Sequence, residues 1–184
     1  DLSHEEHDAL IAKRPELGDY SSRVNVSPEH QAKIIQSGDI NKIRELAKNR
    51  NLAPEHQATL MLSKDIDVLW NLVQNPNLTP EAQATLMDID NPSVLRNLAE
   101  NPNLAPAAQA KLAKSSNTYV LHSLATNPNL APEHQDTLME STDTDVLWYL
   151  AGNPNLAPVH QAKLAKSGNT EVLQNLATNP NLAP

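Results

Sequence analysis

Hydrophobic residues recur along this chain with the spacing of amphipathic helices, in short segments separated by polar residues and prolines. No segment alternates hydrophobic and polar residues as a half-buried strand would. Each segment is only about two to three helical turns long, so packing between segments must hold the helices in place. In the block from residue 54 to residue 79 we expect core side chains at Ala58, Leu60, Val68, Leu69, Leu72, Val73 and Leu78.

Prolines and capping residues predict where these helices begin and end. Pro54 suits a first helical turn, where its missing N–H needs no partner, and this helix should end near residue 62. Asp65 is a favourable N-cap for a second helix, which must end before Asn75 because a residue preceding proline avoids the helical region. We expect a tight turn, a single turn of 3₁₀-helix, over Asn-Pro-Asn-Leu. The residues equivalent to Asp65 are Asp39, Asn91, Asn117, Asp143 and Asn169.

The same block of 26 residues repeats without a gap through most of the chain. Its second proline stands at Pro28, Pro54, Pro80, Pro106, Pro132, Pro158 and Pro184, always 26 residues apart. A unit this short cannot bury a core alone, so the units must stack on one another. The sequence therefore predicts an all-α solenoid, in which residues 28–184 form six tandem repeats and each repeat is a pair of short helices.

The two ends of the array differ. Residues 1–27 look like a degenerate first repeat, and Ser3 with Glu6 forms a capping box, so we expect an N-terminal capping repeat here. No matching cap is seen at the other end, although solenoids need polar terminal caps. We therefore expect an array truncated at its C-terminus, or self-association through the uncapped C-terminal face.

The repeat signature resembles that of a known family. Asn-Pro-Asn-Leu-Ala-Pro, an acidic or Asn cap, and Val-Leu-x-x-Leu-Ala-x-Asn-Pro resemble the leucine-rich repeat variant family over roughly residues 28–184. The resemblance implies a right-handed superhelix of alternating α- and 3₁₀-helices without strands. The chain departs from the family in a slightly longer period and in Leu69, where the family often has Arg. HEAT-like and armadillo-like arrays are the neighbouring alternatives.

Some polar residues are as constant as the core. Asparagines recur at the two Asn positions of each Asn-Pro-Asn turn, and a glutamine recurs in each first helix, at Gln31, Gln57, Gln83, Gln109, Gln135 and Gln161. We predict that these side chains bind backbone groups at the turns and form ladders between repeats, because buried polar groups are normally satisfied within the fold. A role in ligand binding is the alternative.

Composition excludes several functions. The chain has 14 Lys plus Arg and 22 Asp plus Glu, and its net charge of -8 disfavours nucleic acid or an anionic membrane as the main partner. Without cysteine it has no thiolate metal site or cysteine nucleophile. No signal peptide and no apolar run of membrane-spanning length is visible, which favours a cytoplasmic location. No set of nucleophile, base and orienting group is found, so we do not expect an enzyme.

Histidines recur in the first helices at His30, His56, His134 and His160. Neighbours in such a row would be about 10 Å apart, too far to share a metal with ~2.1 Å Zn–N bonds. We therefore expect a solvated surface row, and we predict neither a metal site nor a cofactor.

Variation is concentrated on one face of the second helix. Residues 106–131 and 158–183 are almost copies, yet Tyr119, His122 and Ser123 change, and these lie at i, i+3 and i+4. The central row of this face reads Arg44, Trp70, Arg96, His122, Trp148 and Gln174. The adjacent row reads Glu45, Asn71, Asn97, Ser123, Tyr149 and Asn175, and the flanking row reads Asn41, Asp67, Ser93, Tyr119, Asp145 and Glu171.

Large aromatic residues and arginines in a surface row are typical of binding hot spots. The candidate ligand surface comprises Arg44, Trp70, Asn71, Arg96, Asn97, Tyr119, His122, Trp148, Tyr149 and Gln174. Two alternatives remain open: the tryptophans cover apolar helix surface, or the face varies by drift. The absence of acidic residues from the central row of an acidic protein argues against drift.

Three functions are compatible with this surface. The first is a non-enzymatic scaffold that binds a protein or an extended peptide along the second helices. The second is a nucleic-acid-binding array that reads one base per repeat, for which a companion row of Lys and Arg is missing. The third is a structural spacer within a larger protein.

Overall fold

The structure is a computed structural model that describes residues 6, 9, 13, 26–89 and 91–183. All helices in these residues are α-helices, and no strand occurs among them. The helices are α2 Pro28–Gln36, α3 Ile40–Ala47, α4 Pro54–Met61, α5 Ile66–Val73, α6 Pro80–Met87, α7 Pro92–Ala99, α8 Pro106–Leu112, α9 Thr118–Thr126, α10 Pro132–Met139, α11 Thr144–Ala151, α12 Pro158–Leu164 and α13 Thr170–Ala177. The predicted all-α repeat fold is confirmed. The expected capping repeat at 1–27 lies almost entirely outside the described residues.

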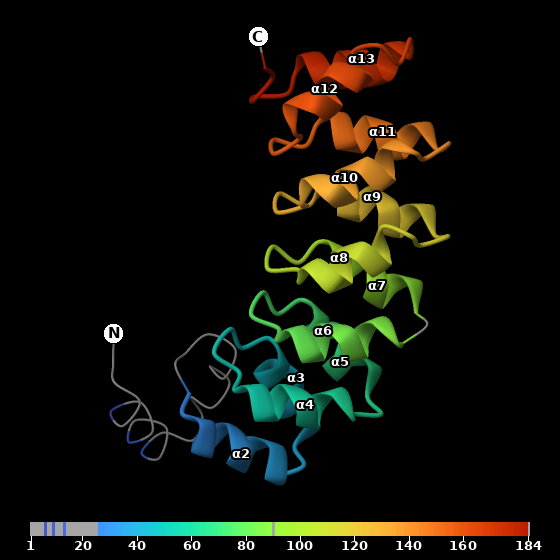
Figure 1. Cartoon of the computed structure of the whole chain (residues 1–184). Coiled ribbons are helices and arrows are strands. Elements are labelled where there is room, and N and C mark those ends of the chain that lie inside the picture. The colour runs from blue at the N-terminus through green and yellow to red at the C-terminus, as the bar shows by residue number, and fades with distance from the viewer. Residues whose placement is uncertain (1–5, 7–8, 10–12, 14–25, 90, 184) are drawn as a thin grey trace. The chain divides into compact units, whose positions relative to one another are not determined.

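The chain divides into two compact units, Asp1–Leu86 and Met87–Pro184, which we call the N-terminal and C-terminal units. Within each unit the helices follow one another in layers (Figure 1). Second helices pack on second helices: α3 on α5 in one unit, and α7, α9, α11 and α13 in succession in the other. First helices contact each other less, so the second helices lie on the more closely packed side of each unit. None of the helices in the described residues is long and apolar enough to cross a membrane.

The predicted helix boundaries are confirmed. Pro54 opens α4, and the Asp65 side chain caps α5 by accepting hydrogen bonds from the N–H groups of Asp67 and Val68 at 3.0 and 3.1 Å. The equivalent side chains also cap their helices, each by accepting one or two backbone N–H hydrogen bonds, at Asp39, Asn91, Asn117, Asp143 and Asn169. The expected 3₁₀ segment is absent from the described residues. An isolated i to i+3 bond, such as Leu52 N–H to the Asn49 carbonyl at 3.0 Å, makes the connection a simple turn.

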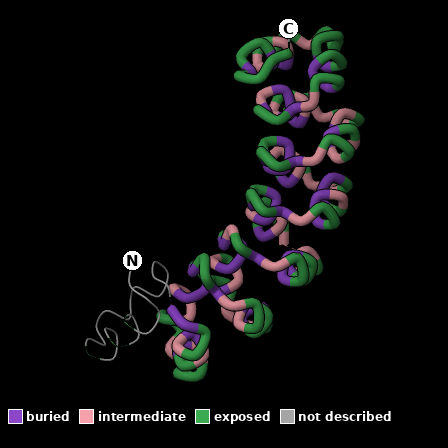
Figure 2. Tube along the Cα trace, turned by 60° about the vertical axis from the view of Figure 1, so that its left-hand side comes forward, coloured by how far each residue is buried: buried purple, intermediate pink, exposed green. Residues whose placement is uncertain are grey.

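The core consists of one stripe from each helix (Figure 2). Five of the expected core residues are buried, at Leu60, Val68, Leu72, Val73 and Leu78. The expectation was wrong for Ala58, which is exposed, and Leu69 is only half-buried. The buried side of α4 carries Gln57, Leu60 and Met61, so Ala58 points to solvent.

The constant glutamines form the predicted ladder. Gln57 Nε2 donates to the carbonyls of Leu52 and Asn77, both at 3.0 Å, and Gln57 Oε1 accepts from Thr79 N–H at 2.9 Å. Each such glutamine therefore joins two consecutive turns, one before its helix and one a repeat later. The same three bonds are made by Gln31, Gln109, Gln135 and Gln161.

The constant asparagines form a second ladder. Asn153 donates to the carbonyls of Ala125 and Asn127 in the preceding repeat, at 2.7 and 2.9 Å, and accepts from Asn155 N–H at 2.8 Å. Asn127 and Asn179 make the equivalent contacts. These amides are used within the stack, which accounts for their constancy without a ligand.

The expected solvated row of histidines was wrong at His160, which is buried. Its Nδ1 lies 3.0 Å from Gln135 Oε1, and its Nε2 lies 2.8 Å from Asp136 Oδ1. The residue equivalent to Asp136 is Ala in the other repeats, as at Ala58 in α4. Among the repeats, only the one that contains α10 therefore carries a carboxylate at this position. Gln135 Oε1 also accepts from Ala157 N–H, so one amide oxygen contacts both His160 and the turn before α12. Hydrogen bonds from His160 and Lys163 lower the pKa of Asp136.

Candidate functional site

The variable face divides between the two units. Arg44, Trp70 and Asn71 belong to the N-terminal unit. The C-terminal unit carries the rest of the predicted surface, at Arg96, Asn97, Tyr119, His122, Trp148, Tyr149 and Gln174. The second helices position all of these residues, because their opposite faces carry the core.

A groove of about 450 Å³ lies over the second helices of the C-terminal unit. Four predicted residues line it together: Arg96, Tyr119, His122 and Tyr149. They come from α7, α9 and α11, so the groove crosses three successive repeats. Four lining residues were absent from the predicted surface: Glu100, Ser123, Thr126 and Asp145.

Three of the groove-lining residues form a continuous strip of aromatic rings, and Trp148, outside the lining, extends it. The Tyr119 and His122 ring centroids are 5.9 Å apart, and those of His122 and Tyr149 are 5.0 Å apart. Trp148 meets Tyr149 edge-on at 5.0 Å. Tyr119 is 68% exposed, and Trp148 is 39% exposed. The strip therefore presents aromatic surface while its own members hold one another in position.

Glu100 organises the polar end of the groove. Its Oε1 lies 3.5 Å from Arg96 Nε and accepts a hydrogen bond from Ser123 Oγ at 2.9 Å. The carboxylate thus joins the end of α7 to α9. The sequence signal for this contact was Glu100 standing four residues after Arg96, the spacing of a helical ion pair.

Arg44, in the N-terminal unit, is bound to the next repeat. Its Nη2 lies 2.7 Å from Asp65 Oδ2 and 3.0 Å from Asp67 Oδ2, and its Nε donates to Asp65 Oδ1 at 3.1 Å. The hydrogen bond from Arg44 lowers the pKa of Asp65, and the same bond raises the pKa of Arg44. Arg44 therefore stabilises the stacking of α3 on α5, and its charge is already compensated.

The same contact explains a feature of the central row. His122 faces Asp143, the cap of the following helix, with 3.7 Å between Nε2 and Oδ2, as Arg44 faces Asp65. Both pairs are 21 residues apart in the chain. An acidic residue in the central row would meet these capping carboxylates, which gives a structural reason for the absence of acids there.

The remaining residues of the predicted surface do not line the groove. Asn71 donates to the Arg44 carbonyl at 3.0 Å, and Asn97 donates to the Ser93 carbonyl at 2.8 Å, so both amides serve the helices. Trp70 is 38% exposed, so much of its ring covers protein surface, as one alternative expected. Gln174 is exposed on α13.

Comparison with known proteins finds no matching family model, no matching curated protein and no matching solved structure. The resemblance to the leucine-rich repeat variant family therefore stays a prediction.

The Arg44–Asp65 pair makes stability depend on acid. A carboxyl whose pKa is lower in the folded state contributes stability above its ordinary pKa of 3.8, and this contribution is lost as the pH falls through the folded value. We expect Asp65→Asn to lower the melting temperature at about pH 7, and we expect this difference to shrink as the pH falls below 3.8. Asn is itself the cap at Asn91, so the variant keeps the helix start. Thermal unfolding of both proteins across this range is the measurement, and a difference that does not change with pH would contradict the assignment.

Proposed function

We propose that this protein is a non-enzymatic repeat scaffold that binds an extended protein segment along the variable face of its second helices. The observation that carries the proposal is the groove of the C-terminal unit. Its residues Tyr119, His122 and Ser123 change between two repeats that are otherwise almost identical. Stacking requires the constant residues, so residues that differ at the groove are available for recognition.

The chemistry of the groove favours a particular kind of segment. Tyr119 and Tyr149 offer aromatic faces, and the groove also carries the carboxylates of Asp145 and of Glu100, the latter paired with Arg96. With a net charge of -8, the chain favours a basic partner. We therefore expect a segment that carries aromatic or aliphatic side chains beside Lys or Arg.

Nucleic acid fits this groove less well. Repeats that read bases need cations to bind the phosphates. In this groove the carboxylates of Glu100 and Asp145 would repel the phosphates. The spacer function would leave the exposed ring of Tyr119 without a role.

The test compares binding by the wild type with binding by a double variant, Tyr119→Ser with Tyr149→Asn. Ser93 and Asn97 stand at the equivalent positions of another repeat, so the variant should fold. Peptides selected by display on the wild type are expected to bind the variant about 30-fold more weakly, because hot-spot residues contribute about 2 kcal/mol or more. Affinity is measured by calorimetry, with matched circular dichroism of all proteins.

Val159→Ala is the matched control, because Val159 is exposed on the first helix α12 of the same unit and its equivalent is Ala107. It should leave affinity unchanged. Equal binding by the wild type and the groove variant would overturn the proposal. Binding of oligonucleotides in place of peptides would favour the base-reading array, and no binding at all would favour the spacer.

A further inference from the structure

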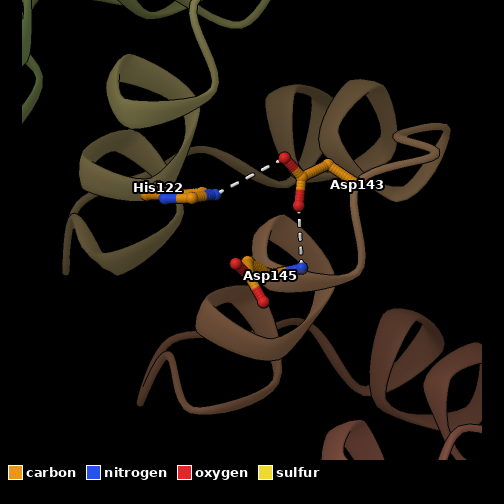
Figure 3. Close-up of side chains that lie close together, drawn as sticks. All are labelled: His122, Asp143 and Asp145. Atoms are coloured by element: carbon orange, nitrogen blue, oxygen red, sulfur yellow. Dashed lines mark hydrogen bonds and ion pairs between the residues drawn. The ribbon is translucent and has the colours of Figure 1, made fainter.

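Three side chains of the C-terminal unit converge at the groove, which His122 and Asp145 also line. His122 comes from α9, Asp143 is the cap of α11 and Asp145 lies in its first turn (Figure 3). One nitrogen or oxygen atom from each lies within 4.8 Å of the others, and this is the only such group of three found in the part of the chain that the structure describes. His122 Nε2 is buried, has no hydrogen-bond partner, and faces Asp143 Oδ2 at 3.7 Å, which is too long for a hydrogen bond.

The N-terminal unit shows what these three positions hold elsewhere. The residues 78 positions earlier are Arg44, Asp65 and Asp67, and there the guanidinium places its positive charge between the two carboxylates at 2.7 and 3.0 Å. The imidazole of His122 is shorter and, in its neutral form, carries no charge. The C-terminal unit thus keeps both carboxylates and replaces the cation with a nitrogen that can donate a lone pair.

We propose that His122, Asp143 and Asp145 bind a divalent transition-metal ion of the zinc class, which takes the place of the Arg44 charge. An imidazole nitrogen and two carboxylates are common ligands of Zn²⁺. Ligand atoms about 2.1 Å from one ion can lie up to about 4.2 Å apart, so the 3.7 Å between His122 Nε2 and Asp143 Oδ2 accommodates an ion between them. Asp145 is exposed, and its carboxylate, within 4.8 Å of the other two ligand atoms, has to move closer to them to reach the same ion.

The two oxygens of Asp143 have separate tasks. Oδ1 accepts the capping hydrogen bond from Asp145 N–H at 2.9 Å, whereas Oδ2 is the oxygen that faces His122. Metal binding therefore preserves the cap of α11. Since the ligands come from α9 and from the start of α11, the ion joins two consecutive repeats. This inference does not depend on the proposed partner of the groove.

The test uses the whole chain without a histidine tag. Co²⁺ is titrated and followed by its visible absorption, and Zn²⁺ is then added in competition. The wild type should bind one Co²⁺ ion, which Zn²⁺ should displace. Binding should also shift the resonances of the His122 ring nitrogens in long-range ¹H–¹⁵N spectra. His122→Arg rebuilds the Arg44 arrangement, and Asp143→Asn keeps a cap that Asn91, Asn117 and Asn169 already provide. Each variant should weaken binding about tenfold or more, since even loss of an outer-shell partner of a ligand has an effect of that size.

His134→Gln is the matched control, because it removes a half-exposed histidine of the same unit from α10. It should leave the affinity for Co²⁺ unchanged. Added Zn²⁺ should also raise the melting temperature of the wild type and leave that of His122→Arg unchanged. The proposal is overturned if wild type binds no Co²⁺ up to about 1 mM, or if His122→Arg binds it as tightly as the wild type does.

Discussion

Replacing Gln135 with Ala is expected to lower the free energy of unfolding by about 3–5 kcal/mol, the largest effect that we predict for a single polar side chain. Gln135 is fully buried. Its amide donates to the carbonyls of Leu130 and Asn155 at 3.0 and 2.9 Å, and it accepts from Ala157 N–H at 2.9 Å and contacts His160. Alanine cannot make these hydrogen bonds, so the carbonyls and the N–H group lose their partner. Each unsatisfied buried group costs about 1–3 kcal/mol.

Gln174→Ala is the control for this experiment. Gln174 is exposed on a second helix of the same unit, so its removal should change stability by less than about 0.5 kcal/mol. Urea unfolding followed by circular dichroism gives the free energies. Hydrogen exchange should locate the loss of protection at the turn before α10 and at the turn before α12. A loss below about 1 kcal/mol for Gln135→Ala would mean that water replaces the glutamine and that the ladder is not a main source of stability.

Leu72→Ala is expected to lower the free energy of unfolding by about 3 kcal/mol, within the usual 2–5 kcal/mol for a buried leucine. Leu72 is completely buried on α5, which packs on α3, and neighbouring helices cannot collapse fully into the space that alanine leaves.

Leu62→Ala provides the matched comparison, because Leu62 lies in the same repeat and is 83% exposed. The equivalent residues are Gln36, Asp88, Lys114, Glu140 and Lys166, so apolar surface is not required there. We expect a change below about 0.5 kcal/mol by the same urea measurement. Equal losses for the two leucine variants would show that the predicted core stripe of α5 does not carry the packing.

Much of the fold follows from local chemistry that is legible in the sequence. Asp65 and Pro54 mark helix starts because capping and the missing proline N–H act within a few residues of chain. The repeat period then supplies what local rules lack, since a side chain as constant as Gln57 must meet the same partner in every repeat. The ladder could therefore be predicted, although its particular carbonyls could not.

The site was less predictable because its contacts join residues of different repeats. Nothing near His160 in the chain indicates burial, and Asp136, its partner, lies 24 residues earlier. Likewise, the sequence identified His122 as a variable residue of the second helix, but not that it faces Asp143. That contact joins neighbouring second helices, across 21 residues of chain. Arg44 and Asp65 have opposite charges and the same separation of 21 residues, so this pair could have indicated the contact from the sequence.

The ladders also determine how this chain can change in length. Asn153 reaches a carbonyl 26 residues earlier, and Gln135 reaches groups 20 and 22 residues later. A single residue inserted into an Asn-Pro-Asn turn would displace these partners on both sides. The connection between the two helices of a repeat, where Gly38 and Gly168 adopt positive φ, contributes no side chain to the glutamine or asparagine ladder. Duplication or loss of whole blocks of 26 residues keeps every rung intact, so the array is built to lengthen or shorten in entire repeats.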